Sequence, residues 1–151
     1  MRRRLGVGRL SLYLGLAAAA NGLIGAARAS PAQDYMLFCM GCHGAQAEGV
    51  PGKVPPLARS LGLFMRTPAG RNYVLRVPGA ANSALSDAQL AAVLNWLAQE
   101  FNAGELNEQA PMFTAAEVTA QRHSPLVSVL AARREVVSAL AATGPAPATN
   151  Y

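Results

Sequence analysis

The chain has 151 residues, which is enough for one domain of ordinary size, and only 14% of them are charged. Its formal net charge of +5 reflects 13 basic and eight acidic side chains, but five of the basic ones and none of the acidic ones lie in the first 29 residues. Residues 30–151 therefore carry eight charges of each sign. This balance gives no support for a nucleic-acid-binding protein.

The first 29 residues have the pattern of a secretory signal peptide. Three arginines at positions 2–4 precede an apolar stretch over residues 10–24, and an Ala-Arg-Ala sequence ends at residue 29. Arg9 directly precedes the apolar stretch and Asn21 interrupts it, and the stretch is shorter than the roughly 20 clean apolar residues of a membrane-spanning helix. We expect cleavage after Ala29 and delivery to the periplasm, with membrane association only if the signal stays uncleaved.

The rest of the chain has no convincing strand pattern and predicts an all-α protein. Ser30 and Pro31 are typical of a helix start, and Ser86 with Gln89 forms a capping-box pattern before an apolar stripe. We predict helices over residues 32–40, 57–65, 86–101, 114–123 and 126–141. Between the first two lies a loop over 44–56. A turn over 67–70 and a short segment over 73–77 precede the third helix, and a linker over 102–113 follows it.

This pattern predicts four segments. Residues 1–29 are the signal peptide, and residues 30–101 are one helical domain. Residues 102–142 form a C-terminal helical extension. The Pro- and Ala-rich residues 143–151 are expected to be a disordered tail.

Residues 39–43, Cys-Met-Gly-Cys-His, form a C-x-x-C-H motif, the pattern of covalent haem attachment. Thiols at Cys39 and Cys42 can each add to one vinyl group of a haem, and His43 can then ligate the iron. A zinc site would need four ligands, whereas the chain has two cysteines and one further histidine, the remote His123. A thioredoxin-like dithiol would need a βαβ setting that the sequence does not show. We therefore expect one covalent haem c per chain.

From these residues, the chain resembles class I c-type cytochromes, which are small exported monohaem proteins. In that family the carbonyl of a proline accepts the other N–H of the ligating histidine. Pro55, 12 residues after His43, is in the position that resembles it, and Leu57 would then pack against the haem. The resemblance covers about residues 31–101.

The resemblance also implies a fold, a cytochrome c-like helical domain around one covalent haem, here with an extra C-terminal helix. In the family, the helix that bears the attachment site crosses the last helix of the domain through apolar side chains. The side chains that resemble this crossing are Tyr35 and Phe38 on one helix and Leu94, Trp96 or Leu97, and Phe101 on the other.

The sequence departs from the family at the sixth iron ligand. Class I cytochromes usually supply a methionine from a Met-Pro pair, where this chain has Val77 and Pro78. The candidates that remain are Met65, in the segment where a distal loop could carry it, then Met112 and His123. An open iron is a further alternative.

The resemblance implies single-electron transfer, between a periplasmic dehydrogenase and a terminal acceptor such as an oxidase or a copper protein. No Ser-His-Asp arrangement, phosphate-binding loop or buried carboxylate pair points to an enzyme, and we expect a carrier. Arg71 and Arg76 are candidates for contacts with haem propionates or with a partner.

Two alternatives follow from the same residues. If the iron is five-coordinate, the protein would bind a small ligand such as NO, CO or peroxide. It would otherwise be a fixed haem subunit of a larger dehydrogenase, with the helix over residues 126–141 as its docking element.

Overall fold

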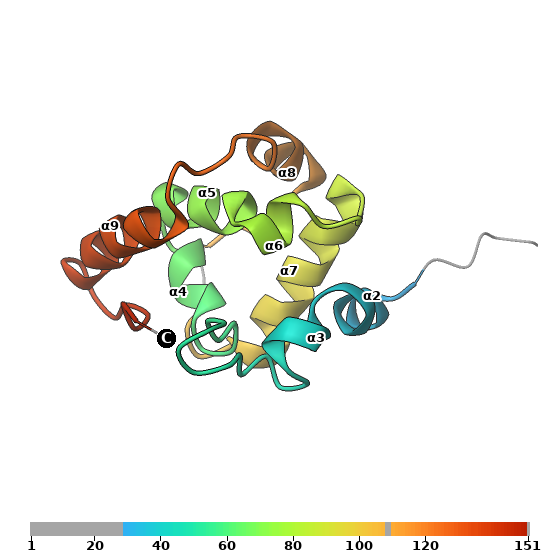
Figure 1. The fold of residues 1–151 in the computed structure, drawn as a ribbon, viewed down its shortest axis with the longest axis horizontal. Helices are drawn as coiled ribbons and strands as arrows, with labels where there is room; N and C mark the ends of the chain where they lie inside the picture. The colour runs from blue at the N-terminus through green and yellow to red at the C-terminus, as the bar shows by residue number, and fades with distance from the viewer. Residues whose placement is uncertain (1–28, 108–109, 151) are drawn as a thin grey trace, which may run out of the picture.

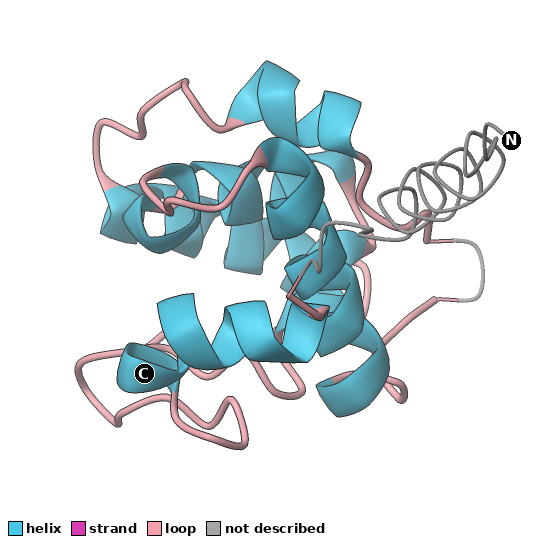
Figure 2. Cartoon of the chain, turned by 90° about the vertical axis from the view of Figure 1, so that its right-hand side faces the viewer, coloured by secondary structure: helices cyan, strands magenta, loops and turns pink. Residues whose placement is uncertain are grey.

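The computed structural model describes residues 29–107 and 110–150, and the predicted signal peptide lies outside this range except for Ala29. The described residues form helices joined by loops, without a β-strand among them, which confirms the all-α fold (Figures 1 and 2). The helices are α2 (Pro31–Phe38), α3 (Met40–His43), α4 (Leu61–Met65), α5 (Pro68–Arg76), α6 (Pro78–Ala81), α7 (Asp87–Phe101), α8 (Ala115–Gln121) and α9 (Val129–Ala141). None of the helices described is both long and apolar enough to cross a membrane.

The first helix begins as predicted but ends earlier. Ser30 forms a full capping box with Gln33, and Pro31 occupies the first turn. At Cys39 the backbone leaves helical geometry, with φ −128° and ψ −39°, so α2 stops at Phe38 and α3 restarts at Met40. The predicted continuous helix over residues 32–40 is therefore two helices, and Cys39 lies at the joint between them.

The middle of the chain is more helical than the sequence predicts. The segment at residues 67–70, predicted as a turn, is the start of α5, because the Thr67 hydroxyl accepts a hydrogen bond from the Gly70 N–H and Pro68 occupies the first turn. The helix predicted over residues 57–65 is shorter, since α4 begins only at Leu61. Tyr73, Val74 and Leu75 of α5 are buried in the core.

The long helix α7 confirms its predicted bounds and its capping box. Its apolar stripe, Leu90, Val93, Leu94 and Leu97, is buried.

Helix α2 packs on α7, and Tyr35 meets the indole of Trp96 with ring centroids 5.5 Å apart. Trp96 in turn meets the ring of Phe101 edge to face, also at 5.5 Å. The predicted crossing is therefore present, except that Phe38 does not join the core and is 49% exposed.

The C-terminal helices pack on the rest of the protein at two places (Figure 1). Thr114 caps α8, which packs on α7 and α5. Helix α9 begins at Val129, capped by Ser128, three residues later than the sequence predicts, and it packs on α5. Figure 1 shows α9 and α2 on opposite sides of the molecule.

The residues after α9 make defined contacts. Pro147 is buried. The Arg133 guanidinium donates hydrogen bonds to the carbonyl oxygens of Ala148, at 2.9 Å, and Thr149, at 3.4 Å. This arrangement differs from the detached tail that the composition of residues 143–151 suggests, because a buried arginine supplies donors that composition alone does not reveal.

Candidate functional site

All the predicted site residues except Met65 line a cavity of about 320 Å³ between the helices, namely Cys39, Cys42, His43, Pro55 and Leu57. This volume lies within the range of about 300–1,000 Å³ that is typical of cofactor pockets. Its walls are mainly apolar, and they include Leu57, Leu61, Phe64, Val74, Val77, Leu90, Val93, Leu94, Leu97 and Val129. Because these residues come from α4, α5, α7, α9 and the adjoining loops, the cavity is formed only by the folded chain.

Cys39, Cys42 and His43 all line this cavity, so the structure brings the three motif residues to one wall. Both thiols are free, with Cys39 half-buried and Cys42 exposed. Burial raises the pKa of the Cys39 thiol, with smaller contributions of the same sign from Asp34 and Cys42. Cys39 is therefore held in its protonated form near neutral pH.

The imidazole of His43 is oriented by the loop that follows it. Its Nδ1 lies 3.0 Å from the Pro55 carbonyl oxygen. Burial lowers the pKa of His43, and the hydrogen bond with Pro55 opposes this shift without reversing it. A neutral imidazole that donates from Nδ1 keeps the Nε2 lone pair available for a metal ion.

The loop between His43 and Leu57 is held by backbone hydrogen bonds. The Gly49 N–H donates to the His43 carbonyl oxygen at 2.8 Å, and the Leu57 N–H donates to the Ala47 carbonyl oxygen at the same distance. Gly49 has φ +69°, and a Cβ there would lie 2.4 Å from the Val54 carbonyl oxygen. Only glycine fits this position, and the tight loop it permits places Pro55 and Leu57 at the cavity.

The methionine predicted as sixth ligand is not at the cavity. Met65 is 1% exposed and packs in the hydrophobic core without lining the cavity. Met112 and His123, the other candidates, are exposed and also lie outside the lining. Short α4 directs Met65 into the core between the helices, which residue spacing alone does not reveal.

Arg71 and Arg76, the candidates for contacts with propionates or a partner, hold the C-terminal extension. Arg71 donates from Nε to the Glu117 carboxylate at 2.7 Å and from Nη1 to the Pro111 carbonyl at 2.6 Å. Arg76 donates to the carbonyls of Ser124 and Pro125. Neither arginine lines the cavity.

The cations that do line the cavity are Lys53 and Arg133. Lys53 is exposed, in the loop before Pro55, whereas Arg133 is 3% exposed on α9. Sequence reasoning missed Arg133. A signal was nevertheless present, because Arg133 stands at i+4 from Val129 and i−4 from Val137 on the apolar side of its helix.

No protein-family model matches the chain. The chain is similar to cytochrome c-552 of Thermus thermophilus, with 30% identity over 118 residues that cover 65% of this chain and 90% of the relative. The chain belongs to the cytochrome c family. A second cytochrome c-552 of Thermus thermophilus matches at the same 30% identity and is covered over 80% of its length.

As a member of this family, the cytochrome is a haem electron-transfer protein, and its cofactor is covalently bound haem c. The residues of the cavity fit this group. Apolar walls suit a macrocycle, two free thiols suit covalent attachment, and the imidazole oriented by Pro55 suits an iron ligand.

Proposed function

We propose that the haem is attached through Cys39 and Cys42, that His43 ligates its iron, and that the protein carries single electrons in the periplasm. One observation carries this proposal. The two thiols and the oriented imidazole line one apolar cavity. Each thiol adds its S–H across a vinyl C=C bond, so that sulfur bonds to one carbon and hydrogen to the other, and no oxidant is consumed.

The side chains around the cavity have distinct roles in this proposal. Pro55 accepts the Nδ1–H of His43 and so sets the orientation and basicity of the imidazole, while Leu57 packs beside it. The apolar walls exclude water, so nearby dipoles and charges have a strong influence on the reduction potential of the site. When bound, the haem supplies one-electron chemistry.

The class I assignment rests on the order of these parts along the chain. Pro55 follows His43 by 12 residues and bonds to it. Val77 occupies the place of the usual methionine and lines the cavity. We therefore propose a class I cytochrome without the Met-Pro pair, with a haem domain over residues 30–101 and an extension over residues 102–142.

Export and partners follow from the attachment chemistry, because c-type haem attachment takes place outside the cytoplasm. Residues 1–29 would direct the chain there as a cleaved signal peptide. An electron carrier requires one redox protein as donor and another as acceptor. We propose a periplasmic dehydrogenase as the donor and an oxidase or copper protein as the acceptor.

The test is to denature the exported, purified protein and extract it with acidified organic solvent. Haem held by two thioether bonds stays with the chain, and a reversible one-electron titration should accompany it. Loss of the colour into the solvent would overturn the proposal.

A second candidate function is the binding of a small ligand at a five-coordinate iron. It is favoured by one observation, since no methionine and no histidine other than His43 lines the cavity within residues 29–107 and 110–150. Fast, tight binding of CO to the reduced protein would support this function. A methionine–iron charge-transfer band in the near infrared that persists in Met112→Ala but disappears in Met65→Ala would exclude it.

The remaining alternative is a fixed subunit of a dehydrogenase. Val127, just before α9, and Leu130, in its first turn, are both exposed, so this end of α9 is accessible to a partner. Co-purification of a dehydrogenase with the untagged protein would support this role, and a monodisperse monomer from the same extract would contradict it.

A further inference from the structure

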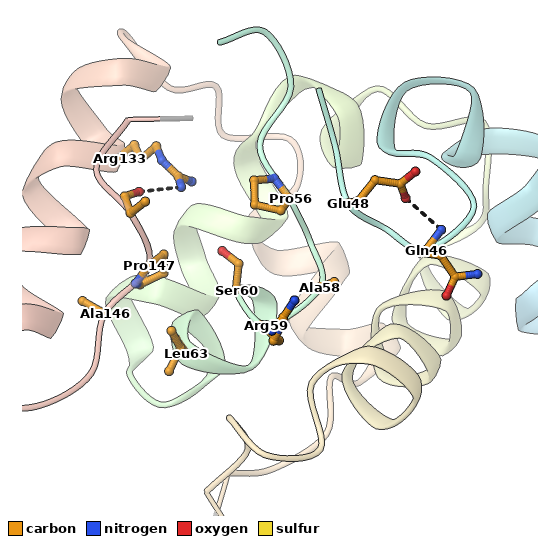
Figure 3. Close-up of a pocket in the computed structure, with 11 residues that line it drawn as sticks. Gln46, Glu48, Pro56, Ala58, Arg59, Ser60, Leu63, Arg133, Ala146 and Pro147 are labelled. Atoms are coloured by element: carbon orange, nitrogen blue, oxygen red, sulfur yellow. Dashed lines mark hydrogen bonds between the residues drawn. The ribbon is translucent and has the colours of Figure 1, made fainter. Parts of the chain in front are cut away.

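A second cavity adjoins the proposed haem cavity. It has a volume of about 440 Å³, and Pro56, Ser60 and Arg133 line both cavities. Figure 3 shows Arg133 and Pro147 on one side of this space and Glu48 with Gln46 on the other. The shared residues therefore mark the end of the haem cavity that opens toward the C-terminal part of the chain.

Arg133 is held at this junction by packing from several directions. Its guanidinium carbon lies 5.4 Å from the centroid of the Phe64 ring, and Phe64 is itself a wall of the haem cavity. The carbonyls of Ala148 and Thr149 accept from its nitrogens. Val129, one helical turn earlier, also lines the haem cavity, so two successive turns of α9 face this cavity.

The haem has two chemically different edges. Thioether bonds to Cys39 and Cys42 would use the edge that carries the vinyl groups, and the two propionate carboxylates belong to the opposite edge of the macrocycle. Helix α9 lies on the opposite side of the molecule from α2, the helix that leads into the attachment motif (Figure 1). A haem attached through Cys39 and Cys42 would present its propionate edge to the cavity wall away from these thiols, and Arg133 and Ser60 line this same cavity from other elements.

We propose that Arg133 binds a haem propionate, so that α9, outside the segment that resembles class I cytochromes, completes the cofactor site. This inference rests on the proposed attachment through Cys39 and Cys42. The guanidinium fork matches the two oxygens of a carboxylate, and its burial strengthens the interaction relative to water. The buried hydroxyl of Ser60 is a second donor at the same junction.

The contact has a consequence for electron transfer. A positive charge that compensates a propionate disfavours the more positive, oxidised form of the haem. Arg133 therefore raises the reduction potential and acts as a positioning residue for the haem.

The experiment measures the reduction potential of the purified holoprotein and of four variants. Arg133→Gln should shift the one-electron equilibrium on the order of tenfold toward the oxidised form, about 59 mV lower in potential. Arg133→Lys keeps the positive charge, so its one-electron equilibrium should lie within about twofold of the wild-type value. Arg134→Gln is the matched control, because it makes the same chemical change at the neighbouring exposed position and should leave the potential unchanged.

The fourth variant ends at Pro145 and removes the carbonyls that Arg133 contacts in the C-terminal segment. It should keep the wild-type potential. If it reproduces the shift of Arg133→Gln, or if Arg133→Gln behaves like Arg134→Gln, the proposal is overturned. If Arg133→Gln does not fold, the propionate bending band is compared between the resonance Raman spectra of wild type and Arg133→Lys. A band that is the same in both proteins also overturns the proposal.

The two proposals fail in different ways. Without covalent haem in the wild type, the proposed function fails before any variant is compared. With covalent haem and equal potentials in Arg133→Gln and Arg134→Gln, only the inference about Arg133 fails.

Discussion

The attachment segment and the C-terminal extension are held in place by different kinds of contact. In the attachment segment, residues 39–57, the hydrogen bonds are local, and the longest of them joins His43 to Pro55, 12 residues apart. The extension is held by side chains that reach much further along the chain. Arg71 pairs with Glu117, 46 residues away, and Arg122 pairs with Asp87, 35 residues away.

This difference between local and distant contacts shows where the spacing of residues in the sequence predicts structure. A motif whose parts lie within about a dozen residues has its geometry largely set by local backbone hydrogen bonds, so its spacing can be interpreted directly. An arginine that meets a carboxylate 46 positions away gives no such signal. Arg71 therefore looks like a free cation in the sequence and is a buried anchor of α8 in the structure.

The largest expected effect tests the attachment segment alone. Replacing both Cys39 and Cys42 by alanine should abolish covalent haem, because no other cysteine is present in the chain. A haem stain of the denatured chain after electrophoresis measures this loss. Met36→Ala, at an exposed position on α2, is the control and should keep wild-type staining, and a stained double variant would contradict the assignment.

The next effect tests the anchoring of the extension. Arg71→Ala removes charge-assisted hydrogen bonds to Glu117 and Pro111 from a position 8% exposed, which should cost about 3 kcal/mol of unfolding free energy. Chemical denaturation measures this cost, and proteolysis within residues 102–114 should accelerate. Arg134→Ala, at an exposed position, should change stability by less than about 0.5 kcal/mol. Equal stability of the two variants would show that the extension does not depend on Arg71.

A third experiment uses pH to weaken the other anchor. Hydrogen bonds from Thr119 and Arg122 lower the pKa of Asp87 below its ordinary value of 3.8. A depressed pKa in the folded state means that the stabilisation is complete above that ordinary value and is lost as the pH falls through the folded pKa. Asp87→Asn should therefore have a lower Tm than wild type at pH 7, and the gap should close as the pH falls below 3.8 and through the lowered pKa of Asp87. A gap that is independent of pH would exclude an ionised Asp87 as its cause.

The smallest effect sharpens the account of the attachment loop. The Tyr35 hydroxyl donates to the Gly44 carbonyl at 2.6 Å, directly after the motif, and burial raises the pKa of Tyr35 to about 12. Tyr35→Phe keeps the ring beside Trp96 and removes only this hydrogen bond, which should cost about 1 kcal/mol in urea denaturation. An unchanged midpoint would mean that backbone hydrogen bonds hold the loop without Tyr35.

Much of the fold could be predicted because its signals are local. Ser30 with Pro31 predicted the start of α2, and the capping box of Ser86 with Gln89 predicted the start of α7, so each signal lies within three residues. The same local logic failed at Thr67 and Pro68. Residues typical of a turn also suit the first turn of a helix, and the packing of Tyr73 to Leu75 in the core selects the helix.

By itself, the sequence determined the helical class and the motif of two thiols and an imidazole, and the resemblance to class I cytochromes implied the proline that accepts from that imidazole. Only the tertiary structure decided which side chains surround the cavity. It placed Met65 in the core, turned Arg71 toward Glu117, and brought Arg133 from α9 to a wall shared with Phe64. The physical reason is that caps and motifs are closed by hydrogen bonds across a few residues, whereas a cavity wall is chosen by packing between helices far apart in the chain.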